Sequence, residues 1–195
     1  EGGPNHLGLI HAEDPNVGDS VPPQPLTGAA FVGPIPFESE DGTNARDQAH
    51  QTLVYRSPEF IMGLNGRISF ALIGGAKPNL DLEEVNANGL QEDSSTDGAI
   101  GVALRHADSG QYISFHARSE DGSQAWETIV LDANTLESLI EPGQAYTLDL
   151  IDSFHGGWGW AGLDNVIIQQ GVRTTQFDFD DETLQGWTVV QGSEE

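Results

Sequence analysis

The feature of this sequence that most constrains its fold is a series of short segments in which apolar and polar residues alternate. Successive side chains of a β-strand point to opposite faces, so alternation with a period of two is typical of strands that have one buried face. In the clearest case, Ile100, Val102 and Leu104 alternate with smaller or polar residues. The strand-like segments are His6–His11, Thr52–Met62, Arg67–Ile73, Ala99–His106, Gln111–Arg118, Trp126–Leu131, Ala145–Ile151, Leu163–Gln169 and Phe177–Asp180.

Residues that favour turns, chiefly glycine and proline, separate these segments and supply the connections that a β-rich chain needs. Asp108–Gly110 is short, polar and ends in glycine, so it predicts a tight hairpin between the two segments beside it. Ala133–Ile140 alone has convincing helical spacing, with Asp132 or Asn134 as the N-cap and Pro142 beyond its end. The sequence therefore predicts an all-β fold with one short helix.

Two stretches do not follow the alternating pattern. Glu13–Asp47 is rich in proline but contains apolar residues such as Phe31 and Phe37, so we expect a long ordered excursion rather than a free linker. Pro78–Asp97 is acidic and polar, and predicts an exposed loop. The sequence contains no internal repeat and no low-complexity tract.

The charge of the chain excludes some partners. There are 31 acidic residues against 7 basic ones, which gives a formal net charge of −24. Nucleic-acid binding requires a basic patch, and an anionic membrane surface would repel this chain, so neither is an expected partner. Salt screens such a charge. The acidic surface is then either a solubility device for saline surroundings or, in part, a set of ligands for Ca²⁺.

We expect a secreted or cell-surface protein. The chain has no cysteine, which excludes disulfides, a thiol nucleophile and a cysteine-based zinc site but does not place the protein in the cytosol. It has no apolar stretch long enough to span a membrane. It begins at Glu1 rather than at methionine, as expected for a processed, exported product.

Four motifs carry a family resemblance. They are Tyr55–Phe60 (YRSPEF), Ile68–Gly75 (ISFALIGG), His155–Val166 (HGGWGWAGLDNV) and Phe177–Val190 (FDFDDETLQGWTVV). Together they resemble a family of bacterial extracellular jelly-roll domains, which are similar to galactose-binding-like and concanavalin-like sandwiches. From Tyr55 to Val190, the stretch that contains the motifs spans roughly two thirds of the chain. The resemblance implies a jelly-roll β-sandwich of two antiparallel sheets.

One motif is displaced relative to that family. Phe177–Val190 resembles the family's first strand but follows the last-strand motif in this chain. Residues 171–195 would then either close the sandwich formed by residues 1–170, or fill the vacant slot of a neighbouring subunit by β-strand addition. Head-to-tail addition would give an open filament. A third alternative is a unit cut from a tandem array. The residues expected to anchor this strand are Phe177, Phe179, Leu184, Trp187 and Val189.

The resemblance also implies a structural Ca²⁺ that joins the first strand to the last. Asp164 matches the position on the last strand, and Asp180 the one on the first, with Asp178 or Asp181 as alternatives. Carboxylate oxygens are suitable ligands for Ca²⁺. The alternative is that these carboxylates simply face solvent.

A sugar site is the second functional possibility, because exposed aromatic rings stack on sugar rings. The candidate sugar-binding residues are His155, Trp158 and Trp160, and Trp158, in a glycine-rich segment beside His155, is the best candidate for an exposed platform. Packing in the core explains Trp160 and Trp187 more simply.

Catalysis is not expected. The histidines form no metal-binding spacing such as HExxH, and no GxSxG nucleophile motif is present. Two hypotheses remain: an extracellular structural protein that polymerises with copies of itself by strand donation, and a module that binds an extracellular polysaccharide.

Overall fold

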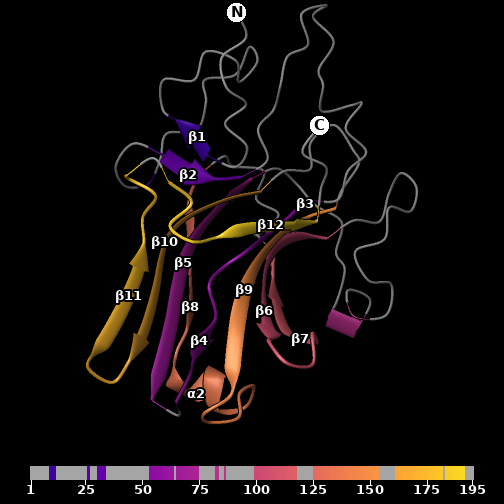
Figure 1. Ribbon diagram of the computed structural model, residues 1–195, viewed down its shortest axis with the longest axis vertical. Coiled ribbons are helices and arrows are strands. Elements are labelled where there is room, and N and C mark those ends of the chain that lie inside the picture. Colours follow the sequence, from indigo (N-terminus) through magenta and orange to yellow (C-terminus); the bar gives the residue numbers. More distant parts are fainter. Residues whose placement is uncertain are drawn as a thin grey trace, which may run out of the picture.

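The computed structural model is a sandwich of two antiparallel β-sheets with one short helix, which confirms the fold class predicted from the sequence (Figure 1). The structure describes residues 9–11, 26, 30–33, 53–63, 65–74, 82–83, 86, 99–117, 125–153, 161–181 and 183–191. Successive strands pass repeatedly from one sheet to the other, so each sheet is built from segments that lie far apart in the sequence.

The first sheet, called sheet I, has the strand order β1-β2-β10-β5-β8, and β11 also pairs with β10. Its strands are β1 (Leu9–His11), β2 (Ala30–Val32), β5 (Gly66–Gly74), β8 (Glu127–Leu131), β10 (Ala161–Gln170) and β11 (Arg173–Phe177). The β10–β11 hairpin forms an arm at the side of the sandwich (Figure 1).

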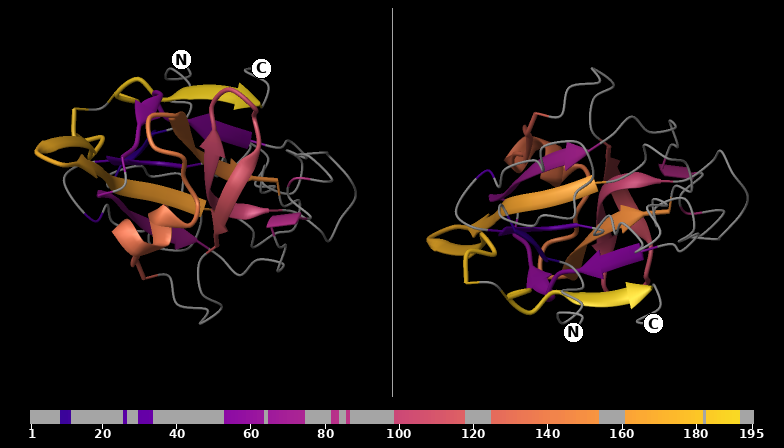
Figure 2. Two further views of the ribbon diagram at one scale, coloured as in Figure 1. Left: turned by 90° about the horizontal axis from the view of Figure 1, so that it is seen from below. Right: turned by 90° about the horizontal axis from the view of Figure 1, so that it is seen from above.

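The second sheet, sheet II, has the order β12-β3-β9-β6-β7, and β4 pairs with the N-terminal end of β9. Its strands are β3 (Leu53–Arg56), β4 (Phe60–Ile61), β6 (Ile100–His106), β7 (Tyr112–His116), β9 (Ala145–Asp152) and β12 (Thr188–Gln191). The predicted hairpin at Asp108–Gly110 joins β6 to β7. Figure 2 shows the two layers looking along the strands from both ends.

The main core lies between the two sheets. It contains Phe70 and Leu72 from sheet I together with Leu104 and Leu148 from sheet II, all at most 1% exposed. Each fully buried side chain of this size contributes about 1.5–3 kcal/mol through the hydrophobic effect. The alternation seen in the sequence therefore reflects strands with one face in this core.

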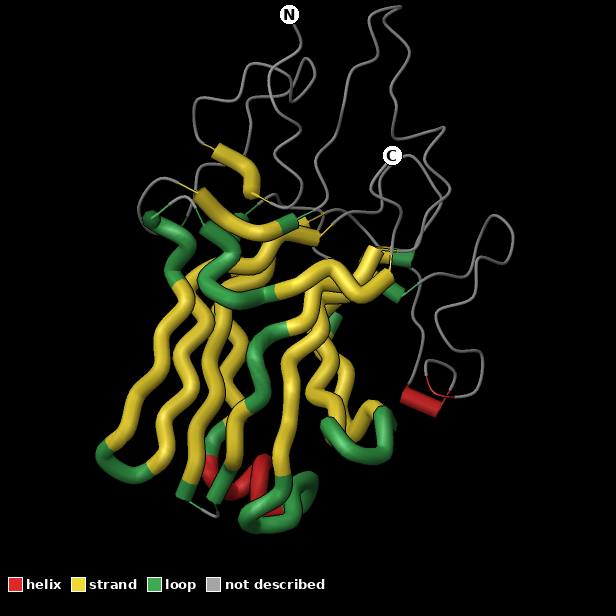
Figure 3. The backbone as a smooth tube through the Cα atoms, viewed as in Figure 1, coloured by secondary structure: helices red, strands yellow, loops and turns green. Residues whose placement is uncertain are grey.

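The helix α2 (Ala133–Glu137) lies at one end of the sandwich, beside the end of β8 (Figure 3). Asp132 is its N-cap, because the Asp132 carboxylate accepts a hydrogen bond of 2.9 Å from the Thr135 N–H. Leu136 is fully buried in the main core. The helix is shorter than the predicted Ala133–Ile140, since the residues after Glu137 form turns.

Two local predictions were wrong, those of single strands at Thr52–Met62 and Phe177–Asp180. Thr52–Met62 is not one strand but two, β3 and β4, with Ser57–Glu59 between them. The excursion predicted at Glu13–Asp47 is ordered in part of its described residues, where it supplies strand β2 with the buried Val32. Phe177–Asp180 is not a strand, because β11 ends at Phe177 and Phe179 has a positive φ of 57°.

The displaced C-terminal motif lies within the sandwich of its own chain. β12 pairs antiparallel with β3, with Thr188 opposite Arg56 and Val189 opposite Tyr55. Phe177, Phe179 and Trp187 are 7%, 0% and 2% exposed and belong to the main core, and Leu184 and Val189 pack partly buried against it. In this single chain the strand therefore occupies an edge of sheet II that would otherwise end at β3.

No helix among the described residues has both the length and the apolar character needed to cross a membrane.

Candidate functional site

The outer face of sheet II, which points away from the main core, carries a second and smaller apolar cluster. Its buried members are Val54, Ala99, Ala103, Tyr112 and Ile151, and Leu82 and Phe115 pack against them. A sheet face opposite the core is usually solvated and polar in an antiparallel sandwich. The buried apolar residues on this face therefore distinguish it from the outer face of an ordinary sandwich.

A group of polar side chains lies at the centre of the same face; Arg56, Tyr112, Thr147 and Asp149 are called the polar cluster below. Arg56 and Asp149 are register partners on β3 and β9. The Arg56 Nε donates to Asp149 Oδ1 at 2.9 Å and Nη2 donates to Oδ2 at 2.6 Å. Such a two-point contact fixes the orientation of the guanidinium plane.

Two hydroxyl groups complete the environment of Asp149, which is 0% exposed. The Tyr112 hydroxyl donates to Asp149 Oδ2 at 3.1 Å, and the Thr147 hydroxyl donates to Oδ1 at 3.3 Å. A buried carboxylate is costly unless it is paired and hydrogen-bonded, and here both oxygens receive charged and neutral donors.

The cluster shifts the acid–base properties of its members. The Asp149 carboxylate, through its hydrogen bond, raises the pKa of Arg56 above its ordinary value. Burial, and then the negative charge of Asp149, raise the pKa of Tyr112 above its ordinary value. Both residues therefore keep their protons at neutral pH, so that Arg56 is a cation and Tyr112 a neutral hydrogen-bond donor.

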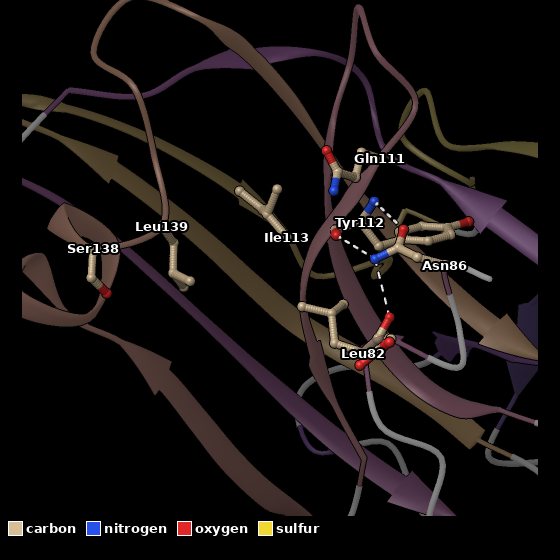
Figure 4. A pocket seen from close by; sticks show the side chains of 8 residues that line it. Leu82, Asn86, Gln111, Tyr112, Ile113, Ser138 and Leu139 are labelled. Atoms are coloured by element: carbon tan, nitrogen blue, oxygen red, sulfur yellow. Dashed lines mark hydrogen bonds between the residues drawn. The ribbon is translucent and has the colours of Figure 1, made fainter.

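A groove of about 760 Å³ runs along the edge of sheet II at β7. This β7 groove is lined by Leu82, Glu83, Asn86, Gln111, Tyr112, Ile113, Ser138 and Leu139. Figure 4 shows Asn86 and Leu82 on one side and Ser138 and Leu139, from the end of α2, on the other. Tyr112 belongs both to the groove and to the polar cluster, so the two features adjoin.

Asn86 covers the exposed backbone of β7. Its side-chain amide donates to the Tyr112 carbonyl at 2.8 Å and accepts from the Tyr112 N–H at 3.0 Å, and it also donates to the Leu82 carbonyl at 3.1 Å (Figure 4). An amide that pairs with both backbone groups of one residue imitates a neighbouring strand. It thereby blocks part of an edge at which another chain could pair, and it connects β7 to Leu82.

The carboxylates predicted to bind Ca²⁺ are in different surroundings. Asp164 is 0% exposed, and its oxygens accept from the Leu26 N–H at 2.9 Å and from the Asn165 N–H at 2.6 Å. Asp178 and Asp181 both accept from the Gln185 side-chain amide, at 2.9 Å and 3.3 Å.

In the part of the chain that the structure describes, no three acidic or histidine side chains come together as a metal site. Asp180, which is exposed, donates its N–H to Asp178 at 3.4 Å. The described contacts of these carboxylates are those of a buried strand anchor and of a hydrogen-bonded turn. Calcium binding here stays a prediction.

The predicted sugar-binding residues His155, Trp158 and Trp160 lie outside the described residues. Trp187, expected to be a core residue, is 2% exposed and packs edge-to-face against Phe177 and Phe179 at ring-centroid distances of 5.9 Å and 6.0 Å.

None of the residues of the polar cluster was predicted from the sequence to be functional. A signal was present at Asp149, since a carboxylate lies in the middle of a segment, Ala145–Ile151, that was expected to be half-buried. Its partners Arg56 and Tyr112 could not be recognised, because they are 93 and 37 residues away and meet Asp149 only when β3, β7 and β9 share a sheet.

The fold and this site together define an all-β sandwich protein with a buried polar cluster and an adjoining edge groove on one sheet. Comparison of the chain with protein-family models, with curated proteins and with solved structures finds no match.

Proposed function

We propose that this protein is an extracellular carbohydrate-binding module that holds a polysaccharide segment in the β7 groove. The observation that carries the proposal is the joint presence of the groove and the polar cluster, which share Tyr112. The groove volume of about 760 Å³ is within the range of small-ligand sites.

The lining of the groove suits a sugar ring, which has apolar C–H faces and hydroxyl groups at its rim. Leu82, Ile113 and Leu139 supply apolar surface, and Gln111 and Glu83 supply polar side chains that are exposed. Binding sites of this kind combine mostly apolar walls with a few well-placed polar groups. The groove residues therefore offer both kinds of contact that a saccharide uses.

The groove is also held in place before any ligand arrives. Asn86 fixes the backbone of Tyr112, and Asp149 fixes its hydroxyl. A site whose walls are already ordered loses less conformational entropy on binding. The pairing of β12 with β3 in the same chain further supports a module that acts alone, since a self-closed sandwich needs no neighbour to complete it.

The test is retention on immobilised polysaccharides, measured by affinity electrophoresis with the Gln111→Ala and Ile113→Ala variants. Each should weaken retention by roughly tenfold, which corresponds to about 1.4 kcal/mol. Thr174→Ala on the exposed strand β11 is the matched control and should behave as the parent chain. Unchanged retention of both groove variants, with loss in Trp158→Ala, would move the sugar site to residues 155–160.

Strand donation is the second candidate function, and the anchoring of the C-terminal segment favours it. This segment brings three aromatic side chains into the core, and β12 pairs with β3 alone among the described strands. The same contacts could be made with β3 of a neighbouring copy. Deleting residues 176–195 should then give monomers, and the missing peptide added in trans should restore a stable fold. Fibres formed by the truncated chain would refute strand donation.

A further inference from the structure

We infer that the site selects an acidic saccharide, and that Arg105 and Arg56 bind its carboxylate or sulfate group; this selectivity rests on the proposed function. The few basic residues of this acidic chain are not spread evenly over the fold.

The chain has 7 basic residues, and four of them are in the described part: Arg56, Arg67, Arg105 and Arg173. Arg67 and Arg173 belong to sheet I. Arg56 and Arg105 both belong to sheet II, and the positive charges of both act on the Tyr112 hydroxyl. The described cations of sheet II are therefore gathered around one tyrosine.

Strand register places these cations on the same face. Arg56 is opposite Asp149, which is opposite Ala103 on β6, and Arg105 lies two residues further along β6. Side chains two residues apart on a strand share a face. With two strand spacings and two residue rises, the Arg56 and Arg105 Cα atoms are about 12 Å apart. Arg105 is also the register partner of Tyr112, which lines the β7 groove.

The two guanidinium groups differ in their pairing. Arg56 is held by Asp149, but that contact uses Nε and Nη2 only, and the Arg56 side chain is 25% exposed. A guanidinium has five N–H donors, so further donors remain available for a ligand. Arg105 forms no ion pair with a carboxylate of the described residues, although the chain contains 31 acidic residues.

The position of Arg105 is accommodated by the hairpin. Its side chain is half-buried and passes close to Gly110, where an added Cβ would lie 2.9 Å from the Arg105 Nη2. Glycine at this position leaves the space that the guanidinium occupies. A partly desolvated cation favours an anionic partner, and no described carboxylate fills that role.

The group formed by the polar cluster and Arg105 has a net charge opposite in sign to that of the whole chain; Glu83, an exposed residue of the groove lining, lies outside this group. Arg56 and Arg105 contribute two positive charges and Asp149 one negative charge. Tyr112 adds none, because burial raises its pKa and keeps the phenol protonated. The single positive charge of this group attracts an anion at short range, while salt screens the repulsion from exposed acidic residues, including Glu83 in the groove lining.

The experiment compares an oligomer of galacturonic acid with the same oligomer after reduction of its carboxyl groups, using titration calorimetry at about 0.15 M salt. The parent chain should bind the acidic oligomer roughly tenfold more tightly, a difference of about 1.4 kcal/mol. Arg105→Gln should lower the ratio of the two affinities to about one and leave the affinity for the reduced oligomer unchanged. Arg67→Gln, which removes the same charge from sheet I, is the matched control and should keep the preference.

The outcomes separate the two proposals. Equal affinity of the parent chain for the acidic and reduced oligomers overturns the selection for acidic sugars and leaves the carbohydrate module standing. An equal loss of preference in Arg105→Gln and Arg67→Gln also overturns it, because the effect would then come from overall charge. If the parent chain binds neither oligomer and is not retained by any polysaccharide on the gels, both proposals are overturned.

Discussion

Arg56 and Asp149 face each other across the β3–β9 pair, and two hydrogen bonds of 2.9 Å and 2.6 Å join the guanidinium to the carboxylate. Asp149 is 0% exposed and Arg56 only partly exposed, so the Asp149 charge is stabilised by its hydrogen bonds to Arg56 rather than by water. The pair connects the stability of sheet II to the groove, since Asp149 also accepts the hydrogen bond from Tyr112.

The first prediction concerns this ion pair. Arg56→Met should lower the free energy of unfolding by about 3 kcal/mol, because it leaves the Asp149 carboxylate buried without its cation. The double variant Arg56→Met, Asp149→Leu should recover a large part of that loss, since no charge is then left uncompensated. Urea unfolding measures both values. Arg67→Met, at an exposed position of β5, should change stability by less than about 0.5 kcal/mol.

The two variants also provide the decisive comparison. If the double variant is less stable than Arg56→Met, the pair contributes net stability, and the uncompensated charge does not explain the loss.

The fold class and most strands could be predicted because alternation records which face of each strand is buried. Ile100, Val102 and Leu104 are at most 3% exposed and line the main core, as their spacing predicts. The hairpin at Asp108–Gly110 and the Asp132 cap could be predicted as well, because turn and cap residues act locally.

Other features depend on contacts that alternation does not record. β11 has four exposed residues in succession, Arg173–Gln176, and so has no alternating burial. Its pairing with β10 comes from the hairpin geometry. The polar cluster could not be predicted either, since its residues are brought together by the strand order β3-β9-β6-β7.

The second prediction concerns the C-terminal anchor. Trp187 is 2% exposed between Phe177 and Phe179, and its indole N–H has no hydrogen-bond partner in the described structure. Trp187→Ala should cost about 3–5 kcal/mol, because it leaves a large cavity. Trp187→Phe should cost about 1 kcal/mol, since it keeps an aromatic ring and removes the unpaired donor.

Chemical denaturation followed by circular dichroism gives these values without relying on tryptophan emission. The matched control is Val190→Ala on β12, because Val190 is 44% exposed and should change stability by less than about 0.5 kcal/mol. Equal losses for Trp187→Ala and Val190→Ala would show that the C-terminal segment is not anchored in the core of the chain.

The third prediction concerns the close contact between β6 and β7. A Cβ added at Gly101 would lie 2.4 Å from the His116 carbonyl oxygen and 3.0 Å from the Ala117 Cα. Both atoms belong to the backbone, so the strands must separate to admit a side chain. Gly101→Ala should therefore lower the free energy of unfolding by about 2 kcal/mol or more.

The control for this variant is Gly63→Ala, where the added Cβ meets only the Gln170 side chain at an ordinary distance of 3.5 Å. That variant should be neutral within about 0.5 kcal/mol. Similar stabilities for the two variants in thermal unfolding would mean that β7 is free to move away from β6. The β7 groove would then lack the fixed wall on which the proposed function depends.

The fourth prediction concerns the acid sensitivity of β7. His116 packs edge-to-face against Phe70 at a ring-centroid distance of 6.2 Å, and its Nε2 has no hydrogen-bond partner in the described structure. Burial lowers the pKa of His116 below its ordinary value. The unfolded chain then binds more protons than the folded one, so stability rises with pH over this range.

The loss on acidification should begin as the pH falls through about 6.5, the ordinary histidine value, and end at the lower pKa of the folded state. Unfolding in urea at several pH values between roughly 5 and 7 measures this slope above the range where most carboxylates titrate. His116→Leu should flatten the slope and leave the stability at pH 7 nearly unchanged, because a neutral, apolar side chain fills the same site. A slope that is equally steep in His116→Leu would assign the acid sensitivity to other groups of the chain.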